Sequence, residues 1–353
     1  MKRSKIILMS ILTIFLFIGI LNVNAITTGD TSGNTDTNSK IVTDTANLTV
    51  TGVEVNDTFR AYKILDTFYN SSTNVITYEF TSDFNNFKNS SYGTSYQNLT
   101  VDEYTNLSTS DVDKLSSAYA GYIKGNNISG TDMSVSGTVA SATLQAGSYL
   151  VLPTSTVKVY SVMVGNLDFT ASGNDWIIND EEIVAKVSEA GVSKAVGEVG
   201  YTSGSYSIGD NITFIITGTV PTYPTNATNR VYTIKDTLST GLDFNDISNV
   251  TIEDGGELLT TASNGTVTNT NSETVATIDI TEQVMTIEFN AVNINSNTIT
   301  ITYTASLNDE AGLGVDGENE NNAELTYSND PYGEGTHTTT GIVTNVYTYG
   351  LEI

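Results

Sequence analysis

Residues 298–307 read "TITITYTASL", and apolar side chains alternate with threonine or serine along this stretch. Successive side chains of a β-strand point to opposite faces of a sheet, so a period of two predicts a strand with one buried face. The same period, or nearly the same, recurs in "NLTVTGVEV" (47–55), "NVITYEF" (74–80), "GSYLVLP" (147–153), "TVKVYSVMVG" (156–165), "NITFIITGTV" (211–220), "RVYTIKDTL" (230–238) and "QVMTIEFNAV" (283–292). Many short strands between Gly, Asn and Asp turns favour an all-β fold of β-sandwiches.

The chain has 353 residues, which is enough for two domains that each bury a core. The boundary is expected within "DWIINDEEIVAKVSEAGVSKAV" (175–196), because the only tryptophan, Trp176, closes one strand-rich half and a second opens after it. We therefore predict two tandem Ig-like or Cna-type β-sandwich domains, residues 47–186 and residues 187–346.

One helix is predicted inside the first domain, in "STSDVDKLSSAYAGYIKG" (108–125). Val112, Leu115, Tyr119 and Ile123 fall on one helical face. Ser110 is the expected N-cap, and Gly125 is the expected stop signal. The first sandwich is thus expected to carry a short helical insertion.

The two ends of the chain differ from the predicted domains. Residues 1–25 have a basic start, an apolar run and a small residue at position 25, which is the pattern of a signal peptide; a retained membrane anchor is the alternative. Residues 26–46 are polar without periodicity and predict a flexible leader. Residues 347–353 resemble the start of a truncated further domain.

Composition argues against several classes of function. The net charge of −26 gives an acidic surface, which does not suit nucleic acid or an anionic membrane. The chain has no cysteine, so no disulfide can lock an exported fold. It has one histidine, His337, and no G-x-S-x-G elbow, which argues against zinc proteases and serine hydrolases. "DGENENN" (316–322) lacks the full calcium-loop pattern. We expect no enzyme acting on an external small-molecule substrate, no cofactor and no required metal.

Three polar residues lie on predicted apolar strand faces, because residues two apart share a face. Lys194 shares its face with Val192 and Val196, and Asp236 shares its face with Tyr232, Ile234 and Leu238. Asn321 shares its face with Ala323, Leu325 and Tyr327. One lysine, one acid and one asparagine are therefore expected to point into the core of the second domain.

Burial of these three residue types suits a particular chemistry. Burial lowers the pKa of an amine and raises that of a carboxyl, so a neutral amine and a protonated acid can coexist. A neutral lysine amine can then attack the asparagine amide, with the acid polarising the amide and relaying protons. The product is a Lys–Asn isopeptide bond, and ammonia leaves. The alternative is a buried Lys194–Asp236 salt bridge, with Asn321 as an ordinary hydrogen-bonding neighbour.

Four phrases within residues 187–346 resemble the isopeptide-forming second domain of sortase-assembled backbone pilins of Gram-positive bacteria. They are "VSKAV", "YSIGDNITFIITGTVPTYP", "YTIKDTLSTGLDF" and "NNAELTYSNDP", in that order. The resemblance implies that Lys194 is the amine, Asn321 the amide donor and Asp236 the catalytic acid. The first half resembles a pilin N-terminal domain through "LTVTGVEVNDTFRAYKIL" and "LQAGSYLVLPTSTVKVYSVMVGNL".

The resemblance also implies a lysine that sortase joins to the C-terminal threonine of the next subunit. In this family that lysine ends a W-x-x-x-V-x-x-x-P-K motif, and Trp176 followed by "IVAK" assigns Lys186 to this intersubunit linkage. No proline precedes Lys186 and the spacing from the tryptophan is irregular, so a plain surface lysine of a linker is the alternative. No sorting motif follows Ile353, so the chain is expected to be a fragment or a gene model cut short.

The resemblance therefore predicts a structural subunit of a covalently assembled surface pilus, exported to the cell surface of a Gram-positive bacterium. Its expected partners are neighbouring pilin subunits joined by sortase, and a host surface ligand. The alternative is a non-polymerised surface adhesin that uses the same sandwich domains to bind a host or matrix ligand.

Overall fold

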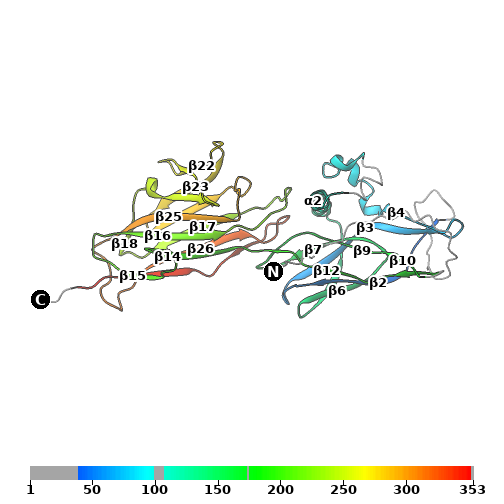
Figure 1. The fold of residues 1–353 in the computed structure, drawn as a ribbon, viewed down its shortest axis with the longest axis horizontal. Coiled ribbons are helices and arrows are strands. Elements are labelled where there is room, and N and C mark those ends of the chain that lie inside the picture. Colours follow the sequence, from blue (N-terminus) through cyan, green and yellow to red (C-terminus); the bar gives the residue numbers. More distant parts are fainter. Residues whose placement is uncertain (1–38, 99–106, 173–174, 351–353) are drawn as a thin grey trace, which may run out of the picture. The chain divides into compact units, whose positions relative to one another are not determined.

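The structure is a computed structural model that describes residues 39–98, 107–172 and 175–350. Its regular secondary structure is mostly β-strand, with one α-helix and a few short 3₁₀ turns among the described residues (Figure 1). The all-β prediction is confirmed. The chain divides into two compact units. Of the described residues, unit 1 holds those within 39–155, 160–187 and 224–227, and unit 2 holds those within 156–159, 188–223 and 228–350. The two-residue strands β8 (Val159–Tyr160) and β13 (Val187–Ser188) lie where the chain changes unit.

Unit 1 is built on one sheet that folds back on itself. Its strands are β1 (Ser39–Ile41), β2 (Thr45–Thr51), β3 (Thr58–Asn70), β4 (Val75–Phe80), β5 (Thr131–Ser136), β6 (Val139–Gln145), β7 (Gly147–Thr154), β9 (Met163–Leu167) and β12 (Glu181–Val184). The main order is β12-β2-β6-β5-β3-β7-β9, and β1 and β4 also pair with β3. Because β5 pairs with both β6 and β3, it joins the two layers of the sandwich. A separate hairpin joins β10 (Phe169–Ser172) to β11 (Asp175–Ile178).

The helical insertion of unit 1 follows β4. It contains three short 3₁₀ turns, η1 (Ser82–Phe84), η2 (Phe87–Asn89) and η3 (Thr94–Tyr96), and the helix α2 (Thr109–Asn126). The predicted helix is confirmed, but Ser108 is its N-cap and accepts a hydrogen bond from the Asp111 amide, whereas Ser110 lies inside the helix. Gly125, the predicted stop signal, also lies inside the helix, and Asn127 ends it in the left-handed conformation. Residues 108–110 are Ser, Thr and Ser, and each of these residue types can cap a helix. The sequence therefore did not identify which of them is the N-cap.

The ordered part of unit 1 begins earlier than the sequence predicts. Within the predicted leader, residues 39–46 form β1 and the start of β2, so this part of the prediction is wrong. The reason is Val42, which is completely buried in a cluster with Tyr69, Phe169 and Trp176. Residues 26–38, like the predicted signal peptide at 1–25, lie outside the described residues.

Unit 2 is a sandwich of two sheets. Sheet A contains β14 (Gly191–Val196), β16 (Asn211–Thr219), β25 (Thr298–Leu307), β19 (Thr251–Asp254) and β20 (Glu257–Leu258) in this order, and β18 (Leu242–Phe244) pairs with β25. Sheet B has the order β15 (Ser203–Ser205), β28 (Ile342–Tyr347), β26 (Asn319–Ser328), β17 (Tyr232–Leu238), β24 (Val284–Phe289), β23 (Thr274–Thr281), β22 (Thr266–Thr268) and β21 (Thr260–Thr261). The strand β27 (Thr336–Thr338) pairs with β26, and η4 (Ile247–Asn249) is a short 3₁₀ turn.

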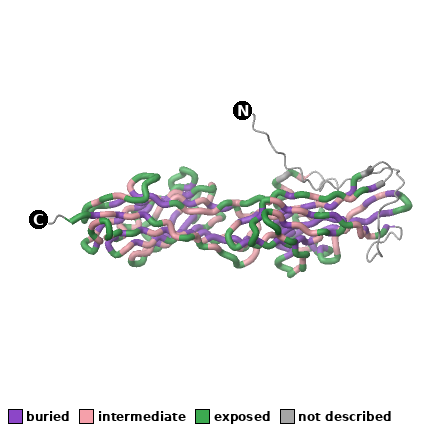
Figure 2. The backbone as a smooth tube through the Cα atoms, turned by 90° about the horizontal axis from the view of Figure 1, so that it is seen from below, coloured by how far each residue is buried: buried purple, intermediate pink, exposed green. Residues whose placement is uncertain are grey.

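The core of unit 2 lies between sheets A and B. In β25, the strand quoted first, Ile299, Ile301, Tyr303, Ala305 and Leu307 are buried, and every second residue turns outward. The same alternation holds in β16 and β17. Figure 2 shows buried residues along the strands of both units, whereas the loops are mostly exposed. The period of two thus sets which face of each strand is buried.

The end of the described chain belongs to unit 2. Tyr347 is the last residue of β28, and Thr348 forms a bridge with Leu313. These two residues therefore do not start a further domain, because their backbone completes the sandwich of unit 2; residues 351–353 lie outside the described residues. Within the described residues, no helix is long and apolar enough to cross a membrane.

Truncating the unit 1 core should destabilise that unit. Leu48 in β2 is completely buried, so Leu48→Ala should lower the free energy of unfolding of unit 1 by about 2–5 kcal/mol. Val184 in the neighbouring strand β12 is 55% exposed, and Val184→Ala should cost about 0.5 kcal/mol or less. Urea unfolding followed by the fluorescence of Trp176, which is buried in unit 1, measures both. Equal losses for the two variants would contradict the assigned core.

Candidate functional site

Lys194 projects from sheet A into the core of unit 2. Its strand β14 pairs with β16, where Lys194 lies opposite Ile216. The residue is 5% exposed, and its Nζ lies 5.5 Å from the ring centroids of both Phe214 and Tyr303. The burial predicted from strand parity is confirmed for this lysine, and two aromatic rings lie near its amine.

Asp236 and Asn321 project from sheet B toward the same region. Their strands, β17 and β26, are antiparallel neighbours in which Asp236 lies opposite Ala323 and Asn321 lies opposite Leu238. The two polar residues are therefore diagonal neighbours on one face. Both are completely buried, as the sequence predicts.

These three residues meet in one polar cluster, and a fourth residue joins them. Lys194 Nζ donates hydrogen bonds to Asp236 Oδ1 and to the hydroxyl of Tyr303, the latter at 3.1 Å. The Tyr303 hydroxyl donates to Asp236 Oδ2 and accepts from Asn321 Nδ2 at 2.6 Å. Asn321 Oδ1 is buried without a hydrogen-bond partner. Sheet A thus supplies a lysine and a tyrosine, and sheet B supplies an acid and an amide.

Burial dominates the electrostatics of this cluster. It lowers the pKa of Lys194 to about 8, although the nearby Asp236 carboxylate opposes this shift. Burial, together with the charge of Asp236, raises the pKa of Tyr303 well above its usual value, so its hydroxyl stays protonated. A neutral lysine amine is therefore accessible near neutral pH, next to an acid that can take its proton.

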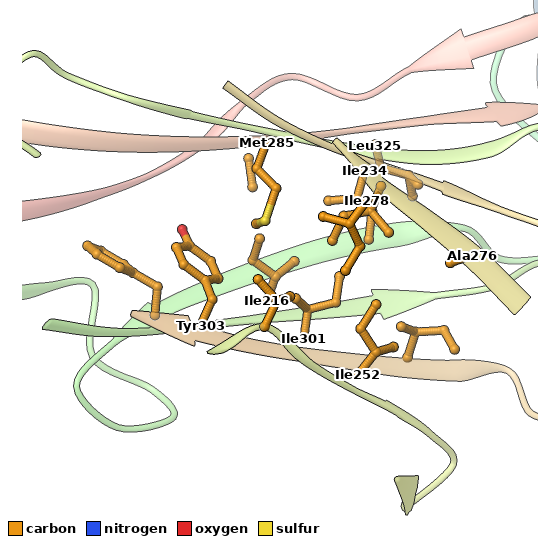
Figure 3. Close-up of a cluster of buried hydrophobic side chains, with 14 of the residues drawn as sticks. Ile216, Ile234, Ile252, Ala276, Ile278, Met285, Ile301, Tyr303 and Leu325 are labelled. Atoms are coloured by element: carbon orange, nitrogen blue, oxygen red, sulfur yellow. The ribbon is translucent and has the colours of Figure 1, made fainter. Parts of the chain in front are cut away.

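Tyr303 was not predicted from the sequence as a member of this cluster. Its position in "TITITYTASL" is inward, between Ile301 and Ala305, where a tyrosine fits an ordinary apolar core position. Parity therefore gave no reason to separate its hydroxyl from the surrounding aliphatic side chains. Figure 3 shows the Tyr303 ring among these core side chains, with its hydroxyl oxygen directed away from β25.

Lys186 lies apart from this cluster. It follows β12 in unit 1, and its carbonyl accepts a hydrogen bond from the Ser161 amide at 2.9 Å. Its side chain is exposed. The backbone is thus held in place while the amine is open to solvent.

The polar stretch 316–322 is used by the fold. The side chain of Asn319 accepts from the Gly312 amide and donates to the carbonyls of Gly312, Gly317 and Val346. Within the described residues, no three His, Cys, Asp or Glu side chains are grouped so as to hold a metal ion.

Comparisons with known proteins agree with this fold. No protein family model matches the chain. The chain is 30% identical over 128 residues to the trypsin-resistant surface T6 protein of Streptococcus pyogenes serotype M6, a match that covers 35% of this chain and 23% of that protein. The solved structure of the T6 backbone pilin of serotype M6 Streptococcus pyogenes matches with a TM-score of 0.63 and 23% identity, covering 87% of this chain and 64% of that chain. The chain therefore spans less than two thirds of these relatives, and the predicted likeness to Gram-positive backbone pilins is confirmed in its fold.

In Asn321→Ala the Lys194 amine cannot form an isopeptide bond with residue 321. This variant should therefore show how much stability is lost by burying the charged amine. We expect the free energy of unfolding of Asn321→Ala to rise as the pH increases from about 8 toward about 10. In this range the folded state has lost the Lys194 proton, whereas the unfolded state still binds it, so raising the pH favours folding. Below about 8 both states carry the proton and the full cost is present. Urea unfolding across this pH range measures the effect.

The control is the double variant Asn321→Ala/Lys194→Met, which has no amine at position 194 to titrate. It should show no such rise between about pH 8 and about pH 10. A flat or falling profile for Asn321→Ala itself would contradict a lowered pKa of Lys194.

Proposed function

We propose that this chain is a structural subunit of a sortase-assembled surface pilus, in which an isopeptide bond between Lys194 and Asn321 locks unit 2. The observation that carries the proposal is the buried cluster of Lys194, Asp236 and Asn321 between the two sheets. The fold shared with the T6 backbone pilin supports it. Export through residues 1–25 to the cell surface is part of the same proposal.

The proposed bond forms between groups that the fold brings together. Asp236 takes a proton from the Lys194 ammonium, and the neutral amine attacks Cγ of Asn321. A new C–N bond forms, the bond from Cγ to Nδ2 breaks, and nitrogen leaves as ammonia. The burial of the site removes competing water and holds the amine beside the acid, both of which favour this step.

Such a bond would join β14, near the start of unit 2, to β26, which pairs with the last strand, β28. Cross-linking a long loop typically stabilises a domain by about 2–4 kcal/mol in disulfides, because it restricts the unfolded chain. A cross-link between β14 and β26 would also carry tension applied to the two ends of the unit. This role suits a chain without cysteine that works in an extracellular fibre.

Lys186 is the proposed acceptor for the next subunit. Its exposed amine on a fixed backbone can reach an acyl-enzyme, whereas Lys194 is buried and cannot. The two lysines of "IVAKVSEAGVSK" (183–194) would then have separate covalent roles, one between subunits and one within a domain.

The intramolecular bond is tested by intact-protein mass spectrometry. The folded chain should weigh less than its calculated mass by one ammonia, and a tryptic digest should contain a peptide that joins Lys194 to Asn321. Asp236→Ala should give the unmodified mass, because the acid that accepts the lysine proton is lost. Lys235→Ala changes the exposed neighbour of Asp236 and should keep the bond. A well-folded chain with the full calculated mass would refute the bond.

The intersubunit role is tested with a pilus-type sortase and a donor pilin. A covalent adduct should form with the chain and disappear in Lys186→Arg, because a guanidinium is not a nucleophile for the acyl-enzyme. Lys235→Arg replaces another exposed lysine and should leave the adduct unchanged. An adduct that persists in Lys186→Arg would move the linkage to another residue. No adduct with several competent sortases would favour the non-polymerised adhesin.

A further inference from the structure

The hydroxyl of Tyr303 lies where the reacting groups of the proposed bond meet. A tyrosine hydroxyl can donate one hydrogen bond and accept two. Here it donates to Asp236 and accepts from Lys194 and Asn321, so each of its hydrogen bonds is made to a group that the proposed reaction uses. In the part of the chain that the structure describes, the Tyr303 hydroxyl makes no other hydrogen bonds.

Among the described residues, the Asp236 carboxylate accepts no hydrogen bond from the departing nitrogen of Asn321 and accepts from two other groups. One carboxylate oxygen accepts from Lys194 and the other accepts from Tyr303. Among the hydrogen bonds of the described residues, Asn321 Nδ2 contacts the Tyr303 hydroxyl and not the carboxylate. The amide nitrogen needs an added proton to leave as ammonia, and the hydrogen-bonded route from the acid to this nitrogen runs through Tyr303.

We propose that Tyr303 is a catalytic residue of isopeptide bond formation, which relays a proton from Asp236 to the departing nitrogen of Asn321. This inference rests on the proposed function of the site. It adds Tyr303 of sheet A to the lysine, the acid and the amide of the proposed reaction.

The proton transfers balance over the whole reaction. Asp236 first takes one proton from the Lys194 ammonium, and the amine attacks Cγ of Asn321. Tyr303 then gives its hydroxyl proton to Nδ2 and receives the proton held by Asp236, as the bond between Cγ and Nδ2 breaks. The Lys194 nitrogen gives a second proton to Asp236 and keeps one as the amide hydrogen. Ammonia leaves, Tyr303 is a hydroxyl again, and Asp236 ends protonated.

The surroundings of Tyr303 hold the hydroxyl in this position. The residue is 1% exposed, and its ring stacks on Phe214 with a centroid distance of 5.5 Å and an interplanar angle of 21°. The centroid of the Phe244 ring lies 5.6 Å from that of the Tyr303 ring. Because the ring is fixed by these contacts, the hydroxyl needs no reorganisation before the proton transfer.

The first test compares two variants that each lose one buried hydroxyl. Tyr303→Phe should slow bond formation by about 10²-fold or more, the usual contribution of a positioned proton-transfer group. Tyr232→Phe is the matched control, because Tyr232 lies on β17 with Asp236, is 1% exposed, and has a hydroxyl without a hydrogen-bond partner. Its rate should equal that of the wild type. Pulse-labelled cell-free synthesis of the chain, followed by mass spectrometry over time, measures the rates.

The second test separates proton relay from simple positioning. Replacing Tyr303 with 3,5-difluorotyrosine keeps the ring and the hydroxyl but makes the hydroxyl more acidic. A relay predicts a changed rate of bond formation and a changed pH dependence, whereas a hydroxyl that only positions its neighbours predicts neither. Circular dichroism of each variant shows whether it has folded.

The outcomes distinguish this inference from the proposed function. If the folded wild type never loses ammonia, the proposed bond and this inference both fail. If the wild type links and a folded Tyr303→Phe links at the same rate, only the role of Tyr303 fails. If Tyr303→Phe does not fold, the difluorotyrosine variant decides, and an unchanged rate would overturn the relay.

Discussion

The burial of Lys194 against Asp236 is the constraint on which the rest of unit 2 depends. Taking an ammonium and a carboxylate out of water costs several kcal/mol for each ion, and their attraction offsets this only with good geometry and further hydrogen bonds. Tyr303 supplies such hydrogen bonds to both ions, and Asn321 in turn donates to the tyrosine. Desolvation still lowers the pKa of Lys194 to about 8. The fold therefore holds an amine that readily becomes neutral beside groups that can react with it.

The acids of unit 1 that pair with a tyrosine or a lysine lie in a different environment. The Tyr160 hydroxyl donates to Asp57 at 2.6 Å, and the Tyr78 hydroxyl donates to Asp168. Lys63 pairs with Asp66 at 2.8 Å, but these two side chains are 18% and 20% exposed. The Nζ atom of Lys63 is itself buried, but both side chains of this pair keep part of their surface exposed, whereas in unit 2 the side chains of Lys194 and Asp236 are completely buried. The same residue types thus give an ordinary ion pair in one sandwich and a candidate reactive site in the other.

Much of the fold follows from local sequence pattern. The period of two in "TITITYTASL" and "YTIKDTL" matches the buried faces of β25 and β17, because side-chain alternation is a property of a single strand. The helix α2 follows from its apolar face in the same way. Its N-cap at Ser108 and the early strand β1 were missed, because neighbouring polar residues are equally suited to cap, and because Val42 is buried by residues distant in the sequence.

The sequence by itself determined that Lys194, Asp236 and Asn321 point inward, each on its own strand. It also determined that Lys186 belongs to the segment between the two strand-rich halves. Only the tertiary structure decided that β14 and β25 of sheet A pack against β17 and β26 of sheet B so that these side chains come close together. It also decided that Tyr303 completes the cluster. Strand parity fixes the face on which a side chain lies. It carries no information about which strands face each other across a sandwich, because that depends on how the two sheets pack.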